Sequence, residues 1–318
     1  MVCEDTINKE QLTMNKEKKY FSHNIIFHFS LFPVLCSLLL LSCQTLPRMP
    51  EAYFSEGILP LDSGAAVYLF ADAKEAKFII NNLPIKELKN DQVRQMINRT
   101  DFIAVALFSI VSGRRFQIAA WGNYPKSGAE MVLGANKNWN KRNAADGSVY
   151  WYSDADKLSM AVNSKQIFAS VWLKDSNVIP YNAAQSVNIP EGFNDFRKAA
   201  VFSCWLENSN RIIQQMLNKT GLPVRMPVQQ LFLSVNKVQS QKDYYEAAIR
   251  LQFENASQAR GAAAILNLAG AFTSSDPELK LIMLFLANPP VQKDRSLEIK
   301  TNPLSEDEII NIIQIFSF

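Results

Sequence analysis

The sequence predicts an α+β protein, built as two similar halves that are each an antiparallel sheet with helices packed on one face. Two observations predict this class. The order strand–helix–strand–strand–helix–strand occurs twice along the chain, and a span rich in Asn with two Pro, residues 175–195, separates the two occurrences. With 48% apolar and 20% charged residues, the composition is typical of a folded globular protein.

The first segment, residues 1–42, has the pattern of a secretory signal peptide. Three lysines just after Met14 (16, 18 and 19) precede the apolar run Ile25–Leu41, and the small residue Ser42 precedes Cys43. The position of the basic cluster predicts that translation starts at Met14 and that residues 1–13 are a mis-assigned start. An uncleaved transmembrane helix is the alternative, but Pro33 interrupts the run, which a span of about 20 residues would have to tolerate.

Cys43 directly follows Leu-Leu-Ser, which resembles the lipobox of bacterial lipoproteins. In that class of protein the matching cysteine is acylated after the signal peptide is removed, so the resemblance implies a lipid on Cys43. Residues 43–60 then form a lipidated tether. An aspartate directly after the lipidated cysteine favours retention in the inner membrane. This chain has Gln44 at that position, so the outer membrane is the expected location.

The first half, residues 61–174, is expected to begin with a strand at Ala66–Phe70 and a helix capped by Asp72. A polar helix around residues 91–97 follows. The remaining elements are five strands and a helix that starts at Pro125 and runs through Leu133; the strands are 102–109, 115–121, 149–152, 158–162 and 167–172.

The second half, residues 196–318, repeats this order. Its expected strands are 200–206, 230–238 and 244–253, with a hairpin that contains 297–299, and its helices are 208–218, 256–272 and a final one that starts at Ser305. Ser305 and Glu308 form a capping box. The apolar run Leu281–Ala287 fits a buried strand or a helix equally well, because periodicity does not separate the two.

Several kinds of catalysis are excluded by the composition after signal cleavage. Both histidines, His23 and His28, lie in the signal, and Cys204 is the one cysteine left besides Cys43. An intrachain disulfide, a zinc site of His and Cys, and Ser-His-Asp or Cys-His chemistry therefore lack their residues. No cofactor or metal is expected. The mature charge of +3 without basic runs also gives no reason to expect nucleic acid as a partner.

The remaining catalytic patterns are read as chance matches. Ser234 and Lys237 match Ser-x-x-Lys, but on a strand two residues three apart face opposite ways. Asp154 and Asp156, near Asp146, fit an ordinary turn between strands. Cys204, within an apolar run, is expected to be buried and inert. The chain is therefore predicted not to be an enzyme, with a carboxylate-only enzyme as a minor alternative.

The helices are unusually apolar, above all the last one, in which no charged residue follows Glu308. Such helices are usually interior, so burial against the sheet is one interpretation. The other is that they line a lipid-sized cavity or enter the bilayer interface, adding a second hydrophobic signal to the lipid anchor. The residues expected to contact lipid under this hypothesis are Ile309, Ile310, Ile312, Ile313, Phe316, Leu281, Leu284 and Phe285.

The lipobox cysteine, the entry Leu59–Ala65 into Val67-Tyr68 and the mixed halves with apolar helices together resemble a treponemal family, the outer-membrane-associated lipoproteins of spirochaetes. Members are tethered to the inner leaflet of the outer membrane and insert amphipathic helices into lipid around an apolar cavity. The resemblance implies the same for this chain: a periplasm-facing lipoprotein that binds lipid. Only Cys43 is carried over as a functional residue.

One rival function is a protein-binding envelope-assembly or scaffold module with an unknown partner. Two similar halves can frame a groove, and Trp121, Trp139, Trp151 and Tyr152 were the aromatic residues expected to form its contact patch. A dominant cross-linked protein partner in cells would favour this rival, and bound lipid would favour the membrane hypothesis.

Overall fold

The computed structural model describes residues 58–82, 98–108, 114–144, 147–155, 157–172, 186–207, 209–210, 213–214, 225–269 and 283–316. The signal peptide, Cys43 and most of the tether lie outside these ranges. So do the polar helix expected around residues 91–97 and most of the helix expected at 208–218. Predictions on these segments remain predictions.

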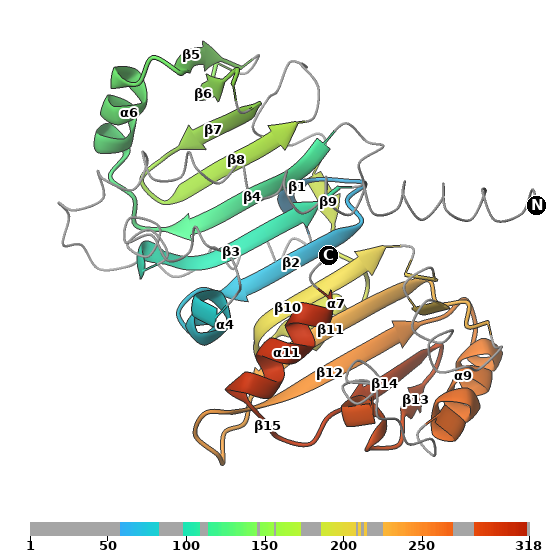
Figure 1. The fold of residues 1–318 in the computed structure, drawn as a ribbon. Coiled ribbons are helices and arrows are strands. Elements are labelled where there is room, and N and C mark those ends of the chain that lie inside the picture. The colour runs from blue at the N-terminus through green and yellow to red at the C-terminus, as the bar shows by residue number, and fades with distance from the viewer. Residues whose placement is uncertain are drawn as a thin grey trace, which may run out of the picture.

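Among the described residues, thirteen strands form one antiparallel sheet (Figure 1). Its order is β13-β14-β12-β11-β10-β2-β3-β4-β8-β7-β6-β5, and β15 pairs with β12 beside this path. The strands are β2 (Val67–Asp72), β3 (Thr100–Leu107), β4 (Arg114–Gly122), β5 (Trp139–Asn143), β6 (Val149–Ser153), β7 (Leu158–Val162), β8 (Gln166–Trp172), β10 (Ala200–Glu207), β11 (Gln230–Lys237), β12 (Tyr244–Gln252), β13 (Val291–Lys293), β14 (Ser296–Lys300) and β15 (Leu304–Ser305).

The two predicted halves meet where β2 pairs with β10, with Leu69 opposite Cys204. On one side of this pair the order is β2-β3-β4-β8-β7-β6-β5, and on the other it is β10-β11-β12-β14-β13. The predicted α+β class and antiparallel pairing are confirmed. The strands of both halves share one sheet rather than forming a sheet each, and the repeat of two similar halves remains a prediction.

Four helices lie on one side of this sheet: α4 (Lys77–Asn82), α6 (Lys126–Ala135), α9 (Ala256–Ala269) and α11 (Glu306–Phe316) (Figure 1). We call this side the helical face; Leu69, Cys204, Leu233 and Ile249 point to it. Since side chains alternate along a strand, their neighbours point the other way. The expectation of helices on one face therefore holds for these four.

The opposite side is covered by a segment that the sequence did not predict. It consists of β1 (Ile58–Asp62), β9 (Ser186–Asn188), which pairs with β1, and the short helix α7 (Phe193–Arg197). We call these three elements the strap and the side that they cover the strap face. β1 begins in the expected tether, 43–60, and ends in the expected first half, whereas β9 and the start of α7 lie in the expected linker, 175–195. Parts of the tether and of the linker therefore belong to the folded structure.

Under the strap lies a cluster of aromatic side chains from both sides of the β2–β10 pair. Phe193 of α7 packs edge-on against Trp205 and Phe232, with ring centroids 4.8 and 5.2 Å apart. Trp205 also stacks on Tyr68, at 4.5 Å, and on Phe70, at 5.2 Å. Such contacts add about 0.5–1.5 kcal/mol each beyond area burial. The strap therefore stabilises the junction of the two halves.

Local sequence explains where the helices begin. Asp72 Oδ1 accepts hydrogen bonds from the backbone N–H of Lys74 (2.9 Å) and of Glu75 (3.0 Å), which caps the turn that leads into α4. At α11 the predicted capping box is present: the Ser305 N–H donates to Glu308 Oε2 (2.8 Å), and the Glu308 N–H donates to Ser305 Oγ (3.4 Å).

Candidate lipid-contacting face

The last helix, α11, carries five of the eight residues that the sequence predicts to contact lipid. Ile309 and Ile312 are 0% and 1% exposed, and Ile310 is also buried. Ile309 and Ile312 pack into the core cluster that α11 forms with α4, β12 and β15. The side chains of Ile313 and Phe316 lie outside the described residues, as does Leu281. In this conformation the described isoleucines of α11 thus belong to the core, so contact with lipid requires α11 to move.

The start of α11 is fastened through Tyr245. The Tyr245 hydroxyl lies 3.4 Å from Glu306 Oε1, and its ring stacks on Phe78 of α4 with centroids 4.4 Å apart. Burial, followed by the negative charge of Glu306, raises the pKa of Tyr245 to about 12. The phenol therefore stays protonated at physiological pH and serves as the donor to Glu306. One aromatic residue joins α11, α4 and the sheet.

The ambiguous run near residue 281 resolves as a helix where the structure describes it. Residues 283–286 are helical. Phe285 is buried and Leu284 is half-buried, and both pack against the same core cluster as α11. Four of the predicted lipid-contact residues, Ile309, Ile312, Leu284 and Phe285, thus meet in one cluster on the helical face.

A partly exposed apolar strip runs across the central strands of the helical face. It consists of half-buried side chains from β2, β3, β4 and β10, which neither α4 and α11 on one side nor α6 on the other fully cover: Leu69, Ile103, Val105, Leu107, Ile118 and Phe202. Isolated exposed apolar residues are common, but adjacent ones often mark a binding surface. Sequence reasoning missed this strip because it arises only when β2 pairs with both β3 and β10.

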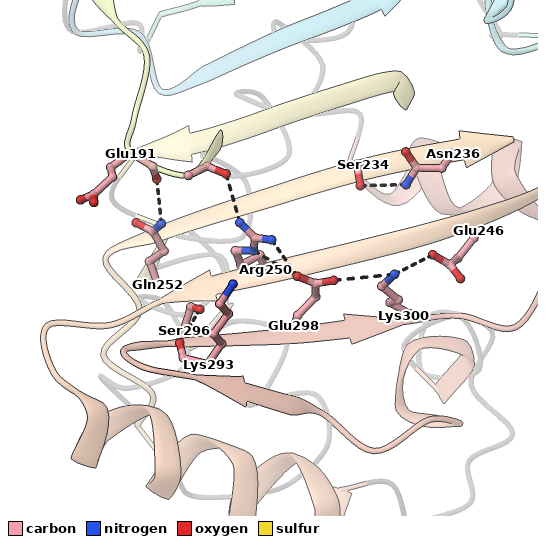
Figure 2. A network of polar contacts seen from close by, with 11 residues as sticks. Glu191, Ser234, Asn236, Glu246, Arg250, Gln252, Lys293, Ser296, Glu298 and Lys300 are labelled. Atoms are coloured by element: carbon pink, nitrogen blue, oxygen red, sulfur yellow. Dashed lines mark hydrogen bonds and ion pairs between the residues drawn. The ribbon is translucent and has the colours of Figure 1, made fainter. Parts of the chain in front are cut away.

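A polar network lies on the strap face, on β12 and β14 (Figure 2). Arg250 donates to Glu298 Oε2 from Nη2 (2.8 Å) and Nε (3.2 Å), and from Nη1 to the Gly192 carbonyl (3.0 Å). Its guanidinium also lies 4.6 Å from the ring centroid of Phe196. Gln252 Nε2 donates to the Glu191 carbonyl (3.1 Å). These contacts bind the strap to the sheet.

The remainder of the network consists of ion pairs. Lys300 Nζ lies 3.2 Å from Glu246 Oε1 and 3.8 Å from Glu298 Oε1. Glu246 and Arg250 on β12 therefore face Lys300 and Glu298 on β14, and each charge is paired with an opposite one, as Figure 2 shows. This pattern indicates a structural role in holding the strap rather than a site that awaits a charged ligand.

The two side chains of the Ser-x-x-Lys match, Ser234 and Lys237, lie on opposite faces of the sheet, as expected. Ser234 Oγ lies on the strap face and accepts a hydrogen bond from Asn236 Nδ2 (3.2 Å). Lys237 Nζ lies 3.1 Å from Glu75 Oε2. Glu75 belongs to the turn that Asp72 caps before α4, on the helical face. Since the two side chains leave opposite faces of β11, Lys237 cannot take a proton from Ser234.

The other chemically active residues are also accounted for in the described part of the chain. Cys204 is buried, as predicted, and burial raises the pKa of its thiol to about 12, which keeps it protonated and inert. Asp154 is an exposed turn residue that pairs with Arg142 at 3.7 Å, whereas Asp146 and Asp156 are not described. Within the described ranges, no group of His, Cys, Asp or Glu could hold a metal ion.

The expectation of an exposed aromatic patch is wrong. Trp121, Trp139, Trp151 and Tyr152 are all buried, because they alternate into the two apolar faces of β4, β5 and β6. Their apolar area is used in the core and is not available to a protein partner. As for membrane-crossing helices, none that the structure describes has both the length and the apolar character to span a bilayer.

Comparison with known proteins finds one family model and several solved structures that are similar to this chain. A family model described as "Outer membrane-associated lipoprotein TP0453" matches residues 57–284. Crystal form IV of TP0453 is similar in structure, with a TM-score of 0.51 and 14% identity over 82% of this chain and 98% of that chain. Crystal form III gives a TM-score of 0.49 and 13% identity over 80% and 96% of the two chains. No curated protein sequence matches this chain.

Proposed function

We propose that this chain, which belongs to the TP0453 family of outer membrane-associated lipoproteins, binds lipid through the apolar helices of its helical face. It is a lipoprotein of the cell envelope at the outer membrane. The proposal adds that Cys43 carries the lipid anchor, that the folded part faces the periplasm, and that the helices enter the inner leaflet or enclose a lipid. It also holds that the protein has no catalytic role.

The observation that carries the proposal is that α11 and the partly exposed apolar strip of the central strands lie on the same face of the sheet. From Ile309 onward α11 has no charged residue, so its exposure to water would be costly but its exposure to acyl chains would not. The partly exposed strip of Leu69, Ile103, Leu107 and Phe202 lies beside it on the same face. An acyl chain placed there would contact apolar side chains along its length.

The burial of α11 sets a condition on this function. Because Ile309 and Ile312 are buried, they reach lipid only when α11 leaves the sheet. The fastening at the start of the helix, by Tyr245 and the capping box, leaves the charge-free end to move first. A lipid can favour the displaced state only by the difference between its affinities for the two states. The second hydrophobic contact would then strengthen a single lipid anchor.

Vesicle flotation of the unacylated mature chain, residues 44–318, tests the proposal, because this chain retains every residue that the structure describes. We expect it to float with phosphatidylcholine vesicles, and we expect lipid extracts of the purified protein to contain phospholipid by mass spectrometry. Protein that remains with the aqueous fraction and carries no lipid would show that the helices are only core. One dominant cross-linked protein in cells would then favour a scaffold role.

A further inference from the structure

Positive charge is concentrated at one end of the sheet. Residues 114–172, which comprise β4 to β8 and α6, contain eight Lys or Arg and four Asp or Glu, so this span carries a net charge of +4. The whole chain has a net charge of +3, so all other residues together carry −1. Figure 1 places α6 next to β5 at this end, away from α11 and from α9. The fold therefore has a cationic end.

The outer surface of α6 consists of small, uncharged residues around one exposed methionine. Met131 is 68% exposed, and Ser127, Gly134 and Ala135 are exposed beside it. The inner surface, with Ala129 and Leu133, is buried against the sheet. Glu130 is the one acidic residue of the helix. Met131 is thus the one large apolar side chain on α6 that is exposed among those that the structure describes.

Three exposed lysines lie at the two ends of α6 and on the adjacent strand β5. Lys126 begins α6, and the one ion pair that it forms with a described residue is a long contact with Glu130, 3.9 Å from Nζ to Oε1. Lys137 follows the helix, and Lys141 on β5 places its Nζ 6.0 Å from the ring centroid of Trp151. A Cβ built on Gly134 would lie 3.3 Å from that same ring, so Trp151 joins α6 to β5. Neither Lys137 nor Lys141 forms an ion pair with another residue that the structure describes.

The simplest alternative explanation is that lysines on the edge strand β5 prevent edge-to-edge aggregation. That explanation accounts for Lys141. It does not account for Lys126 and Lys137, which lie at the two ends of α6 and not on a strand, nor for Met131 between them. An exposed apolar side chain on a helix with lysines at both ends is a pattern found in helices that lie on an anionic membrane surface.

We propose that the outer surface of α6, with Lys126, Met131, Lys137 and Lys141, docks on an anionic phospholipid surface. The lysines contact headgroup phosphates, and Met131 enters the boundary between headgroups and acyl chains. This contact needs no movement of α11, because all four side chains are already exposed or partly exposed. It extends the proposed membrane function, on which it rests, to a second and electrostatic contact.

The tether permits this contact while Cys43 is anchored. Residues 44–57 separate Cys43 from β1, and an extended chain of that length spans about 50 Å. This reach allows either end of the sheet to turn to the membrane. A lipid anchor and a basic patch together give firmer membrane binding than either does alone.

Vesicle binding of the unacylated mature chain tests the docking surface. Vesicles of phosphatidylglycerol and phosphatidylcholine are compared with vesicles of phosphatidylcholine alone. The triple variant Lys126→Gln, Lys137→Gln, Lys141→Gln should weaken binding to the anionic vesicles by about fivefold for each lysine, about a hundredfold in all. Its matched control removes three exposed lysines elsewhere: Lys198→Gln, Lys242→Gln, Lys293→Gln. The control should change binding by less than about threefold, since those residues lie outside the cationic end.

A second pair of variants tests the apolar contact. Met131→Ser on α6 should weaken binding severalfold, whereas Val291→Ser on the edge strand β13, where the valine is 66% exposed, should not. Equal losses in the two lysine triples, or in Met131→Ser and Val291→Ser, would overturn the proposal. So would equal binding of the α6 triple variant and the unmodified chain. If neutral vesicles bind while the α6 variants have no effect, lipid binding stands and the α6 surface is wrong.

Discussion

Replacing Ile309 by alanine tests whether α11 is a packed element that can also be released. Ile309 is 0% exposed within the cluster that α11 forms with α4 and β12. Asn311, two residues further along the same helix, is exposed and serves as a matched control. Both variants keep the capping box of Ser305 and Glu308, so the helix start is unchanged.

The magnitude follows from burial. Isoleucine-to-alanine substitutions in well-packed cores cost about 2–5 kcal/mol, and the higher helix propensity of alanine offsets a few tenths of that. We expect the free energy that holds α11 on the sheet to fall by about 3 kcal/mol in Ile309→Ala. We expect Asn311→Ala to change it by less than about 0.5 kcal/mol.

Hydrogen exchange measures this energy directly. A loss of 3 kcal/mol corresponds to a rise of roughly a hundredfold in the fraction of molecules with α11 displaced. The backbone amides of α11 should therefore exchange about a hundredfold faster in Ile309→Ala, with little change in β10 and β11 if the helix leaves alone. Urea denaturation, followed by the fluorescence of buried tryptophans, gives the effect on the whole fold.

The same variant links the fold to the proposed function. Because displacement becomes easier, Ile309→Ala should float with neutral vesicles more readily than the unmodified chain, whereas Asn311→Ala should not. Unchanged amide exchange in α11 would refute the packing argument. Faster exchange without any gain in flotation would leave the packing intact and refute the role of α11 as a releasable lipid contact.

Three further predictions concern other parts of the chain. In cells, Cys43→Ser should abolish acylation and move the protein out of the membrane fraction, as measured by detergent partitioning. Arg250→Met should lower the free energy of unfolding, measured in urea, by about 2–4 kcal/mol, because the half-buried Glu298 loses its arginine partner and the strap loses its bond to the sheet. Lys237→Met, which breaks an exposed ion pair, should lower it by less than about 1 kcal/mol. Cys204 should resist thiol reagents at pH 8 until the protein unfolds, and since its pKa is about 12 in the folded state, stability should fall as pH rises above about 9, where the thiol of the unfolded chain ionises.

Much of the secondary structure follows from the sequence because it depends on local patterns. The apolar runs within β11 and β12, and the capping box at Ser305, placed these elements within one or two residues. The elements that were missed had no such pattern. β5, Trp-Asn-Lys-Arg-Asn, is mostly polar because it is an edge strand, and β9 and α7 are only three and five residues long.

The candidate site was predictable only in part. The charge-free isoleucine run of α11 identified the helix that matters, but the sequence could not decide whether Ile309 and Ile312 face lipid or protein. It also misplaced Trp121 and Trp151, which an aromatic count favours as a contact patch and the sheet buries. The cationic end could have been found by summing charge over residues 114–172 rather than over the whole chain.

The class of fold followed from the sequence by itself, as did the expectations of export, of lipidation and of a mature chain without histidine, since these depend on composition and short motifs. Only the tertiary structure decided that β2 pairs with β10, that the strap covers an aromatic cluster, and that α11 packs on the sheet. The physical reason is that strand pairing and burial depend on residues far apart in the chain. No local pattern records which of two apolar surfaces a helix will meet.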